Sequence, residues 1–559
     1  MADSRAAELR SVLGNLGFTR DRSEINAIRY VGRIKAAGKP VRVAIKFSDL
    51  EFTHLPTVTI LDPDQQAPNV VAHLFASGNL CFARDEDVVL NRYDVGGAVL
   101  ACLELAKRSL ERVLTHKRLE NEIADEFPQH WLGDSVLYDL TKAETNAARL
   151  YTIDRPDGSS IRLLTANPKR LQRLENDSAK RKVSEACSAP VLIAVTDKRL
   201  TFHRDFKQPE NLDEFLLWIE SIERNSSSAV LKCLAAAYPE FVTRIFVSAP
   251  NGCVGVSFVV PEWLRRAAQR KEAYGNALKT SAAKLAVERH SGTRVDLEYL
   301  FNRNLHKQKS LMDIRIGLIG CGTIGSHLAK LLVQSGAAHG TGTLALLDNQ
   351  TLEPGNIGRH YLGPSYLGES KAKAMKQELA RCFPDGNYFP IEGSAEARIG
   401  DFDNYDLVID AAGEEALSYT INEYFMTRRK AGRATPVILH VRLFGNGAAA
   451  QSFLVDGSQY ACFKCLRPKI TEPWHYNPLK PGIQAIAAAA TCGEGQFIPY
   501  GVAAPVTAAA LALSAILDWR AGSPKARLRT VRIDLENTHQ VPDKNVTPSA
   551  TCPACGTSQ

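Results

Sequence analysis

Apolar and polar residues along the C-terminal half of the chain follow two periods that alternate. From Ile314 onward, short apolar runs of strand length are followed by stretches whose apolar residues recur at helical spacing. This alternation is typical of a mostly parallel sheet with helices on its faces, so residues 306–559 are predicted to form a Rossmann-like α/β domain. The predicted strands are Ile314–Ile319, Gly342–Leu347, Leu407–Ala411 and Pro436–His440, and the predicted helices are Ser326–Ser335 and Ser370–Cys382.

The first 120 residues have a different order, in which one helix precedes several strands. Helical spacing of apolar residues predicts a helix over Ser4–Leu16, and Asp94 is suited to cap a second helix that ends near Val113. The segment His73–Phe82 is predicted to be a loop or a short extended stretch. This order predicts a small α+β domain over residues 1–120, with strands at Ala27–Ile34, Val41–Phe47 and Thr57–Leu61.

Residues 121–305 carry the weakest pattern. Strands are predicted at Ile161–Leu164, Val191–Val195 and Thr243–Val247, and a charged helical stretch at Trp263–Val287. These features predict a mixed α/β linker domain. Because the segment contains no metal triad, phosphate loop or nucleophile elbow, its role stays open.

The composition is that of a soluble globular protein. The chain is 45% hydrophobic and 23% charged, and its net charge of +7 is dispersed, so we expect no nucleic-acid partner. We also expect no signal peptide and no membrane partner, because the Ala-rich stretch Val502–Leu517 is interrupted by Pro505 and Thr507 and predicts a buried helix. A cytoplasmic location would keep the twelve cysteines reduced and available for metal binding, catalysis or packing.

Two Cys-x-x-Cys pairs lie about ninety residues apart near the end of the chain. They are Cys462 with Cys465 and Cys552 with Cys555. Four thiolates at this spacing are typical of a closed tetrahedral Zn²⁺ site that has no open position for catalysis. We therefore predict a structural zinc site that joins the last residues to an earlier segment.

A glycine-rich turn follows the predicted strand Ile314–Ile319. Its glycines are Gly320, Gly322 and Gly325, and a predicted helix comes directly after it. Such a turn lets backbone N–H groups approach a phosphate, and the helix N-terminus adds positive potential. Asp348 ends the next strand, where a carboxylate is suited to hold ribose hydroxyls. The sequence thus predicts a nucleotide site, in which Cys321 only packs beneath the loop.

The residues after Asp348 distinguish among nucleotides. Asn356, Arg359 and Lys371 form a set suited to a polyphosphate, because cationic side chains neutralise charge that develops during nucleotidyl transfer. Asp410 ends a buried strand and is placed to hold Mg²⁺. A nucleoside triphosphate is therefore the expected ligand, whereas a nicotinamide dehydrogenase would leave Arg359, Lys371 and the zinc cysteines without a role.

In their order and spacing, these parts resemble the adenylation domain of the ubiquitin-activating superfamily, which includes activators of thiamine and molybdopterin sulfur carriers. The resemblance covers residues from about 312 to 559. It implies that Arg359 and Lys371 contact ATP phosphates, that Asn356 supports them, that Asp348 holds the ribose and that Asp410 positions Mg²⁺. It also implies a homodimer, and attack of a client protein's C-terminal carboxylate on the α-phosphate of ATP.

Cys492 lies between glycines in the segment Thr491–Phe497. A thiolate in such a loop could take the acyl group from AMP as a thioester. The position is similar to that of the transfer cysteine of activating enzymes that make thioesters, while a buried cysteine at a helix start is the alternative.

A second resemblance concerns the first 120 residues. A helix, three strands and then Gly78-Asn79-Leu80-Cys81 resemble the ubiquitin-conjugating enzymes, in which this cysteine accepts the thioester. Leu74-Phe75 stand where the family has Pro-Asn, and the family's Asn helps to stabilise the oxyanion. Backbone N–H groups, Asn79 or His73 are the candidate replacements. Cys102 is expected in the core of the next helix.

The whole arrangement resembles the fused conjugating–activating enzymes of bacterial anti-phage CBASS operons. That resemblance implies an ATP-dependent ligase that adenylates a client C-terminus, captures it on Cys492, transfers it to Cys81 and conjugates it to a target amine. The client would be a cGAS/DncV-like nucleotidyltransferase or, in related operons, a ubiquitin-like protein. A sulfur-carrier activator and a non-catalytic nucleotide-sensing scaffold are the alternatives.

Overall fold

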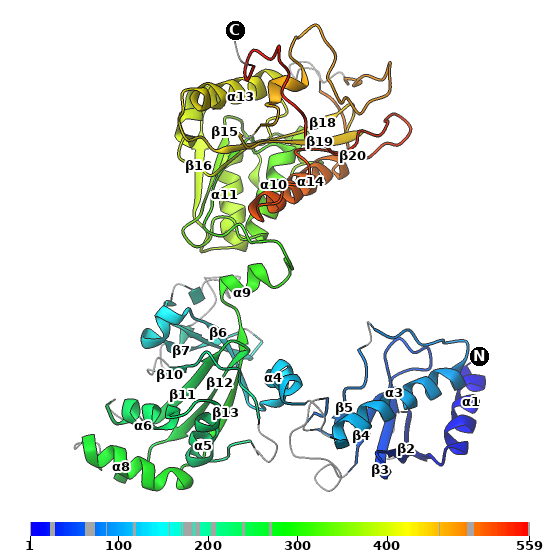
Figure 1. The fold of residues 1–559 in the computed structure, drawn as a ribbon, viewed down its shortest axis with the longest axis vertical. Coiled ribbons are helices and arrows are strands. Elements are labelled where there is room, and N and C mark those ends of the chain that lie inside the picture. Colours follow the sequence, from blue (N-terminus) through cyan, green and yellow to red (C-terminus); the bar gives the residue numbers. More distant parts are fainter. Residues whose placement is uncertain are drawn as a thin grey trace. The chain divides into compact units, whose positions relative to one another are not determined.

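The computed structural model of the chain describes residues 2–22, 28–61, 73–75, 77–84, 87–115, 119–155, 157–168, 170–171, 183–184, 191–202, 208–236, 241–267, 271–457, 459–488 and 497–556. The chain divides into two compact units, the first ending at Val295 and the second formed mainly by Asp296–Gln559. Two of the three sheets belong to the first unit, and the third belongs to the second unit (Figure 1).

An antiparallel sheet of five strands forms the N-terminal part of the first unit. Its strands meander in the order β1-β2-β3-β4-β5, and the helices α1 and α3 pack on one face through Leu9, Leu13, Val95 and Val99. This agrees with the predicted α+β fold, and the backbone N–H of Gly97 donates to the predicted cap Asp94 at 2.7 Å. The elements are α1 (Ala2–Asn15), β1 (Thr19–Asp21), β2 (Ile28–Ala36), β3 (Lys39–Phe47), β4 (Thr57–Ile60), β5 (Asn79–Leu80) and α3 (Val95–Thr115).

A mixed sheet of eight strands forms the rest of the first unit, in the order β10-β11-β12-β13-β6-β8-β7-β9. The helices α5, α6 and α8 pack against one face, where alternate residues of β11 and β12 are buried. The strands are β6 (Asp134–Asp139), β7 (Arg149–Asp154), β8 (Ser160–Thr165), β9 (Val183–Ser184), β10 (Leu192–Val195), β11 (Val242–Ala249), β12 (Gly252–Val259) and β13 (Glu288–Arg294), and the helices are α5 (Leu212–Ile222), α6 (Ser226–Ala236), α7 (Glu262–Ala267) and α8 (Lys271–Ser281).

The predicted helical stretch Trp263–Val287 is wrong at its end. Helix α8 stops at Ser281, a short 3-10 turn follows, and Ala286 bridges to Asn211. The cause is tertiary, because the backbone N–H of Val287 donates to the carbonyl of Glu210 and so draws the chain into extended conformation before β13.

Helix α4 (Leu119–His130), which the sequence pattern did not reveal, packs against the mixed sheet's helices. Phe127 and Trp131 meet Phe202, Phe215 and Trp218 in a buried aromatic cluster. The ring centroids of Phe127 and Phe202 are 4.8 Å apart, and those of Trp131 and Trp218 are 4.7 Å apart. Close aromatic packing of this kind fixes the rotation of α4 about its own axis.

The second unit has the predicted α/β fold. Its seven strands run in the order β16-β15-β14-β17-β18-β19-β20, with the first five parallel and the last two antiparallel additions. The strands are β14 (Arg315–Ile319), β15 (Thr343–Asp348), β16 (Tyr388–Glu392), β17 (Leu407–Asp410), β18 (Val437–Phe444), β19 (Ala449–Val455) and β20 (Leu528–Arg532).

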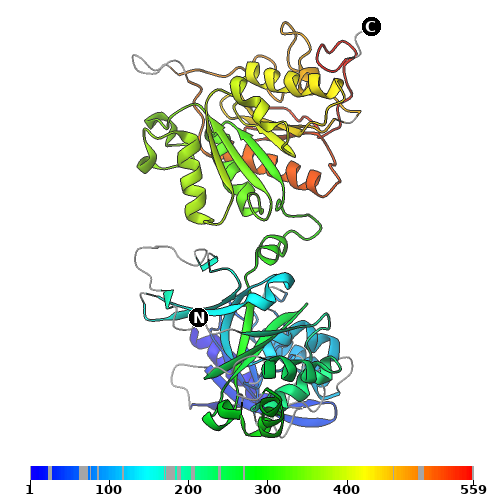
Figure 2. The same ribbon diagram turned by 90° about the vertical axis from the view of Figure 1, so that its left-hand side faces the viewer.

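Two separate cores cover the two faces of this sheet. Alternate strand residues such as Leu344 and Leu346 pack on α10, α11 and α14, while Ala345 and Leu347 face the core that contains α13. Helix α13 lies on the opposite side of the sheet from α14 in both views (Figure 1, Figure 2). The helices are α9 (Leu297–Asn302), α10 (Thr323–Gln334), α11 (Lys371–Cys382), α12 (Ala395–Arg398), α13 (Glu415–Lys430) and α14 (Ala503–Arg520).

The Ala-rich stretch forms α14, as predicted, and its buried alanines pack against α10 and the sheet. Among the residues that the structure describes, no helix combines the length and the apolar character needed to span a membrane.

Candidate active site

The glycine turn joins β14 to the first residue of α10. Gly320 has a φ of +89°, which favours glycine, and a Cβ on Gly325 would collide with the carbonyl oxygen of Gly320. Around Gly322, in contrast, there is open space. Gly320 and Gly325 therefore shape the turn, and the space at Gly322 lets a ligand approach its backbone.

A pocket of about 180 Å³ opens at the carboxyl ends of β14, β15 and β17. Because β15 and β17 lie on opposite sides of β14, this edge is the switch point at which open parallel sheets bind ligands. Asp348 lines the pocket and accepts hydrogen bonds from the backbone N–H groups of Cys321 at 2.7 Å and Gln350 at 2.8 Å. Cys321 is fully buried beneath the loop, and burial raises the pKa of its thiol.

The predicted cations lie beside this pocket and have protein partners. The Nζ atom of Lys371, at the start of α11, donates to Gln350 Oε1 at 2.7 Å. Gln350 lines the pocket, so Lys371 binds a residue of the pocket lining but does not line the pocket itself. Asn356 instead accepts a hydrogen bond from the backbone N–H of Glu353 at 3.0 Å, which caps a short 3-10 turn.

Arg359 lies against the chain that follows residue 496. Its guanidinium carbon is 4.7 Å from the centroid of Tyr500 and 5.8 Å from that of Phe497, and Nη1 donates to the carbonyl of Ile498 at 3.4 Å. Tyr500 also lines the pocket and shares a 2.9 Å hydrogen bond with Thr323 of α10. Sequence reasoning missed this aromatic contact, which no local pattern signals.

Asp410 belongs to a buried polar cluster. Its Oδ2 accepts hydrogen bonds from Ser418 Oγ at 2.5 Å and from His440 Nδ1 at 2.7 Å, and Oδ1 accepts from the N–H of Ala412 at 3.3 Å. The ring of His440 stacks on Phe463 with centroids 4.1 Å apart. The remaining acceptor capacity of Asp410 therefore lies mainly on Oδ1.

The four predicted metal ligands come together. The sulfur atoms of Cys462, Cys465, Cys552 and Cys555 all lie within 4.8 Å of one another. The pair Cys462–Cys552 is separated by 3.7 Å, and a tetrahedral zinc site with bonds of about 2.3 Å would separate its sulfurs by about 3.8 Å. The Nδ2 of Asn422 lies 3.6 Å from the sulfur of Cys462, and the backbone N–H of Ser549 lies 3.4 Å from that of Cys465. Donors of this kind commonly support metal-bound thiolates, so the cluster fits zinc.

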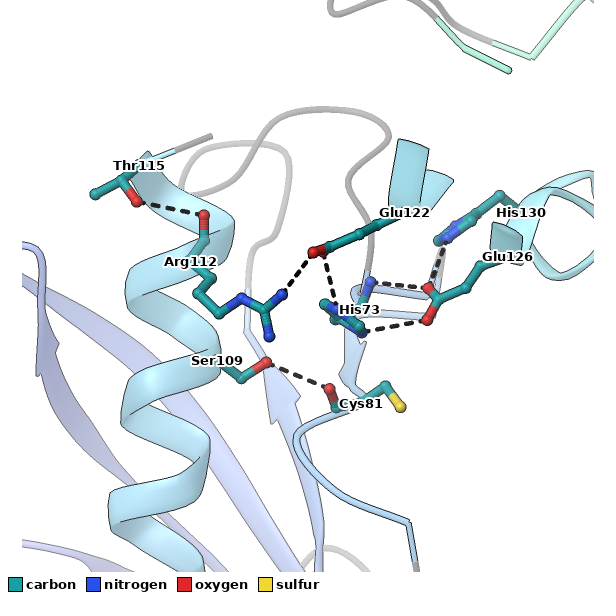
Figure 3. Close-up of polar contacts among 8 residues, drawn as sticks. All are labelled: His73, Cys81, Ser109, Arg112, Thr115, Glu122, Glu126 and His130. Atoms are coloured by element: carbon teal, nitrogen blue, oxygen red, sulfur yellow. Dashed lines mark hydrogen bonds and ion pairs between the residues drawn. The ribbon is translucent and has the colours of Figure 1, made fainter. Parts of the chain in front are cut away.

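Cys81 lies in the first unit, directly after β5. Gly78 precedes it with a φ of +80°, and a Cβ there would lie 2.7 Å from the carbonyl oxygen of Ile60. The backbone N–H of Cys81 donates to the carbonyl of His73 at 2.7 Å, and Ser109 Oγ donates to the carbonyl of Cys81 at 3.3 Å (Figure 3). The main chain on both sides of the thiol is thus held in place.

The Cys81 thiol is half-buried. Burial raises its pKa, the charge of Glu126 raises it further, and Arg84 lowers it. Asn79 faces Thr59, whose hydroxyl donates to Asn79 Oδ1 at 2.7 Å. Cys102 is buried on α3, which agrees with the predicted packing role.

A cluster of charged side chains surrounds His73 (Figure 3). Its Nε2 is 3.2 Å from Glu122 Oε2, its Nδ1 is 3.2 Å from Glu126 Oε1, and Arg112 Nη2 is 2.7 Å from Glu122 Oε1. Hydrogen bonding to Glu126 raises the pKa of His73. Sequence reasoning missed both glutamates, and their only local signal is the spacing of four residues on one helix face. Cys492 lies outside the described residues.

Two family matches define the class of this protein. Residues 298–554 match the ThiF family, and residues 10–136 match Prokaryotic E2 family B. The chain is therefore an enzyme that joins an E2 region to a ThiF-type adenylation region, which confirms the predicted resemblance to fused conjugating–activating enzymes.

Curated relatives match the chain over most of its length and of their own. The chain is 28% identical over 516 residues to the ATP-dependent ubiquitin transferase-like protein Cap2 of Pseudomonas aeruginosa, which covers 91% of this chain and 90% of the relative. It is 26% identical over 529 residues to the Cap2 protein of Vibrio cholerae serotype O1, and this match covers 88% of this chain and 87% of that relative. A crystal structure of Escherichia coli MccB is similar over 44% of this chain and 68% of that chain, at 17% identity and a TM-score of 0.35.

Proposed function

We propose that the chain is an ATP-dependent protein ligase that adenylates a client C-terminus and passes it through Cys492 and Cys81 to an amine. The observation that carries this proposal is the presence, in one chain, of a glycine-loop pocket in a ThiF region and a half-buried cysteine after a glycine turn in an E2 region. The Cap2 relatives, whose name describes an ATP-dependent ubiquitin transferase-like protein, support it.

In the adenylation step, a carboxylate oxygen of the client attacks the α-phosphorus of ATP, the bond to the β-phosphate oxygen breaks, and pyrophosphate leaves. The loop at Gly322 and the N-terminus of α10 bind phosphate through N–H groups. Lys371 and Arg359 exchange their present partners for phosphate oxygens, and Asp348 holds the ribose. Asp410 would hold Mg²⁺, which would supply positive charge beside the phosphates.

One thiolysis of the acyl-adenylate, one thioester exchange and one aminolysis complete the sequence. The thiolate of Cys492 attacks the acyl carbon and AMP leaves; the thiolate of Cys81 attacks that thioester and Cys492 leaves. The amine nitrogen then attacks the Cys81 thioester, loses a proton and releases the Cys81 thiolate. Only the transfer from Cys492 to Cys81 interconverts thioesters of similar energy, so direction comes from the cleavage of ATP.

The proposed client is a cGAS/DncV-like nucleotidyltransferase in anti-phage defence, and a ubiquitin-like protein is the alternative client. Similarity to Cap2 proteins over about nine-tenths of the chain supports this choice. The match to a relative described as an adenylyltransferase and sulfurtransferase covers only 30% of the chain. A sulfur-carrier activator would therefore leave the E2 region of this chain without a role. Residues 1–120, 121–305 and 306–559 are the proposed domains, and the active form is a homodimer.

The test uses the full chain, Mg-ATP and a cGAS/DncV-like nucleotidyltransferase with an intact C-terminus. We expect client-dependent exchange of pyrophosphate into ATP and thiol-labile adducts on non-reducing gels. Cys81→Ala should keep exchange and the Cys492 adduct but lose the amide product, whereas Cys492→Ala should lose both adducts. Conjugation that persists in Cys81→Ala would contradict the proposed role of the E2 region. If neither a cGAS/DncV-like nucleotidyltransferase nor a ubiquitin-like protein stimulates pyrophosphate exchange, the proposed adenylation step is contradicted.

A further inference from the structure

Helix α4 has two functional faces. Phe127 and Trp131 are buried in the aromatic cluster, so the helix is fixed against the mixed sheet's helices. The other face carries Glu122, Glu126 and His130 at successive spacings of four residues. All three contact the segment that precedes Cys81: Glu122 and Glu126 bind His73, and the ring of His130 stacks on Phe75 with centroids 6.4 Å apart.

Glu126 binds both the main chain and the ring of His73. Its Oε2 accepts the backbone N–H of His73 at 3.2 Å, and its Oε1 lies 3.2 Å from Nδ1. Glu122 occupies the other ring nitrogen at 3.2 Å. An imidazole between two carboxylates donates from both nitrogens, and so it holds its proton. Both ring nitrogens of His73 are thus engaged by carboxylates, which favours the protonated ring and leaves no nitrogen free to act as a base at Cys81.

The effect of these contacts reaches Cys81 through the backbone. His73 has a φ of +66°, a left-handed conformation that a non-glycine residue keeps only when its surroundings hold it. In this conformation its carbonyl accepts the N–H of Cys81 at 2.7 Å. Two consecutive hydrogen bonds, Glu126 to His73 and His73 to Cys81, thus connect α4 to the main chain of the thiol.

We propose that Glu126, supported by Glu122, is a positioning residue that fixes the Cys81 loop for thioester transfer through His73. The helix that packs on the linker's aromatic core thereby completes the conjugating site, which gives this part of the chain a role in catalysis. The proposal rests on the proposed function of Cys81 as the acceptor thiol.

The charges that face His73 come from two helices. They are Glu122 and Glu126 from α4, and Arg112 from α3, which pairs with Glu122. His130 of α4 lies 3.5 Å from Glu126. Arg84 acts on the Cys81 thiol itself and opposes the effect of Glu126. Removal of the Glu126 charge therefore has two consequences of opposite sign: an easier ionisation of Cys81 and a looser loop.

The experiment compares the full chain with its Glu126→Gln variant, which keeps the shape of the side chain. Glu104→Gln is the matched control, because Glu104 pairs with Arg108 on the exposed side of α3. Alkylation of the Cys81 peptide by iodoacetamide is followed by mass spectrometry from pH 6 to 10, together with hydrogen exchange of the segment 73–81. Formation of the Cys81 adduct is measured with client and Mg-ATP.

For Glu126→Gln we expect alkylation at pH 8 to be about threefold faster, hydrogen exchange in the segment to be faster, and the Cys81 adduct to form about tenfold more slowly. Pyrophosphate exchange and Glu104→Gln should match the wild type. Unchanged alkylation and adduct formation would overturn the proposal. The proposal would also be overturned if alkylation and adduct formation both became slower and the melting temperature fell, because Glu126 would then only stabilise the fold.

Alkylation and hydrogen exchange need no client. If they change as expected while no adduct forms on Cys81 of the wild type, the proposed function fails and the connection from Glu126 to Cys81 stands. If wild-type adducts form and Glu126→Gln leaves them and the alkylation profile unchanged, the proposed function stands and the positioning role fails.

Discussion

The nucleotide pocket and the Cys81 site are assembled in opposite ways. The pocket is formed by the ends of adjacent parallel strands and by a turn in which backbone geometry requires Gly320 and Gly325. Around Cys81, in contrast, charged side chains of α4 contact His73, from which they are separated by 49 and 53 residues in the sequence. One site is a property of the sheet, and the other depends on a helix that is anchored by aromatic packing.

This difference has a physical consequence. A backbone-built site loses its shape only if the sheet or the turn is damaged, whereas a site held by partly exposed ion pairs responds to small changes of charge. The side chains of His73, Glu122 and Glu126 are 20%, 31% and 32% exposed, so their contacts are individually weak. We therefore expect substitutions at the pocket to have large effects and those near Cys81 to have graded ones.

Loss of the metal cluster should have the largest effect and should be confined to the second unit. Phe463, between two of the cysteines, stacks on His440, which binds the buried Asp410 next to the pocket residue Ala411. For Cys552→Ser we expect loss of zinc and destabilisation of the second unit on the order of 5 kcal/mol or more, since metal binding contributes directly to folding. Calorimetry combined with metal analysis would measure this, with Cys382→Ser as the exposed-cysteine control. A wild type without zinc, or a variant of normal stability, would contradict it.

The glycine turn offers a matched pair of substitutions. At Gly325 an added Cβ would collide with the carbonyl oxygen of Gly320, whereas at Gly322 it would meet open space. We expect Gly325→Ala to reduce pyrophosphate exchange at least about a hundredfold, equivalent to about 2.7 kcal/mol, because the turn must shift. Gly322→Ala should have a smaller effect, mainly on the KM for ATP. Alkylation of Cys81 should be unchanged in both variants, and equal losses of exchange would show that the turn does not depend on close packing.

Features based on local patterns could be predicted from the sequence. The strand, turn and helix around Gly320–Gly325 follow from short-range periodicity and glycine spacing, and the zinc cysteines follow from the chemistry of their pairs although ninety residues separate them. The placement of Asp348 at the pocket also follows, because parallel strands end at one edge.

Features based on tertiary contacts could not be predicted. Helix α4 contains Pro128, which disfavours a helix prediction, and its partners Phe202 and Trp218 lie far along the chain. Arg359 and Tyr500 are in contact although 141 positions separate them in the sequence, and the residues next to each of them give no indication of this contact. The missed end of α8 has the same cause, since a backbone hydrogen bond to Glu210 overrides the local helical pattern.

The glycine before Cys81 should give an intermediate effect. Gly78 combines a φ of +80° with a Cβ position 2.7 Å from the carbonyl oxygen of Ile60, whereas Gly38 has a φ of +78° in open space. We expect Gly78→Ala to destabilise the first unit by about 2–3 kcal/mol and Gly38→Ala by about 1 kcal/mol. Hydrogen exchange of peptides from β3 would measure both. Equal losses would mean that the close approach to Ile60 carries no cost and that the Cys81 loop is less constrained than its geometry indicates.

The smallest effect concerns pH and tests whether side-chain charge really controls the Cys81 site. Hydrogen bonding to Glu126 raises the pKa of His73 above its ordinary value, so the folded state favours the protonated ring. This contribution is complete below the ordinary histidine pKa of about 6.5 and is lost as the pH rises through the raised value. The difference in unfolding free energy between the wild type and His73→Asn, measured by hydrogen exchange of β3 peptides, should stay below about 1 kcal/mol and shrink from pH 6 to 9. In the Glu126→Gln background the pH dependence should flatten, because only Glu122 then favours the proton. A difference that grows with pH would mean that the neutral ring is the preferred form, and the site would then need a different account of how the loop is held.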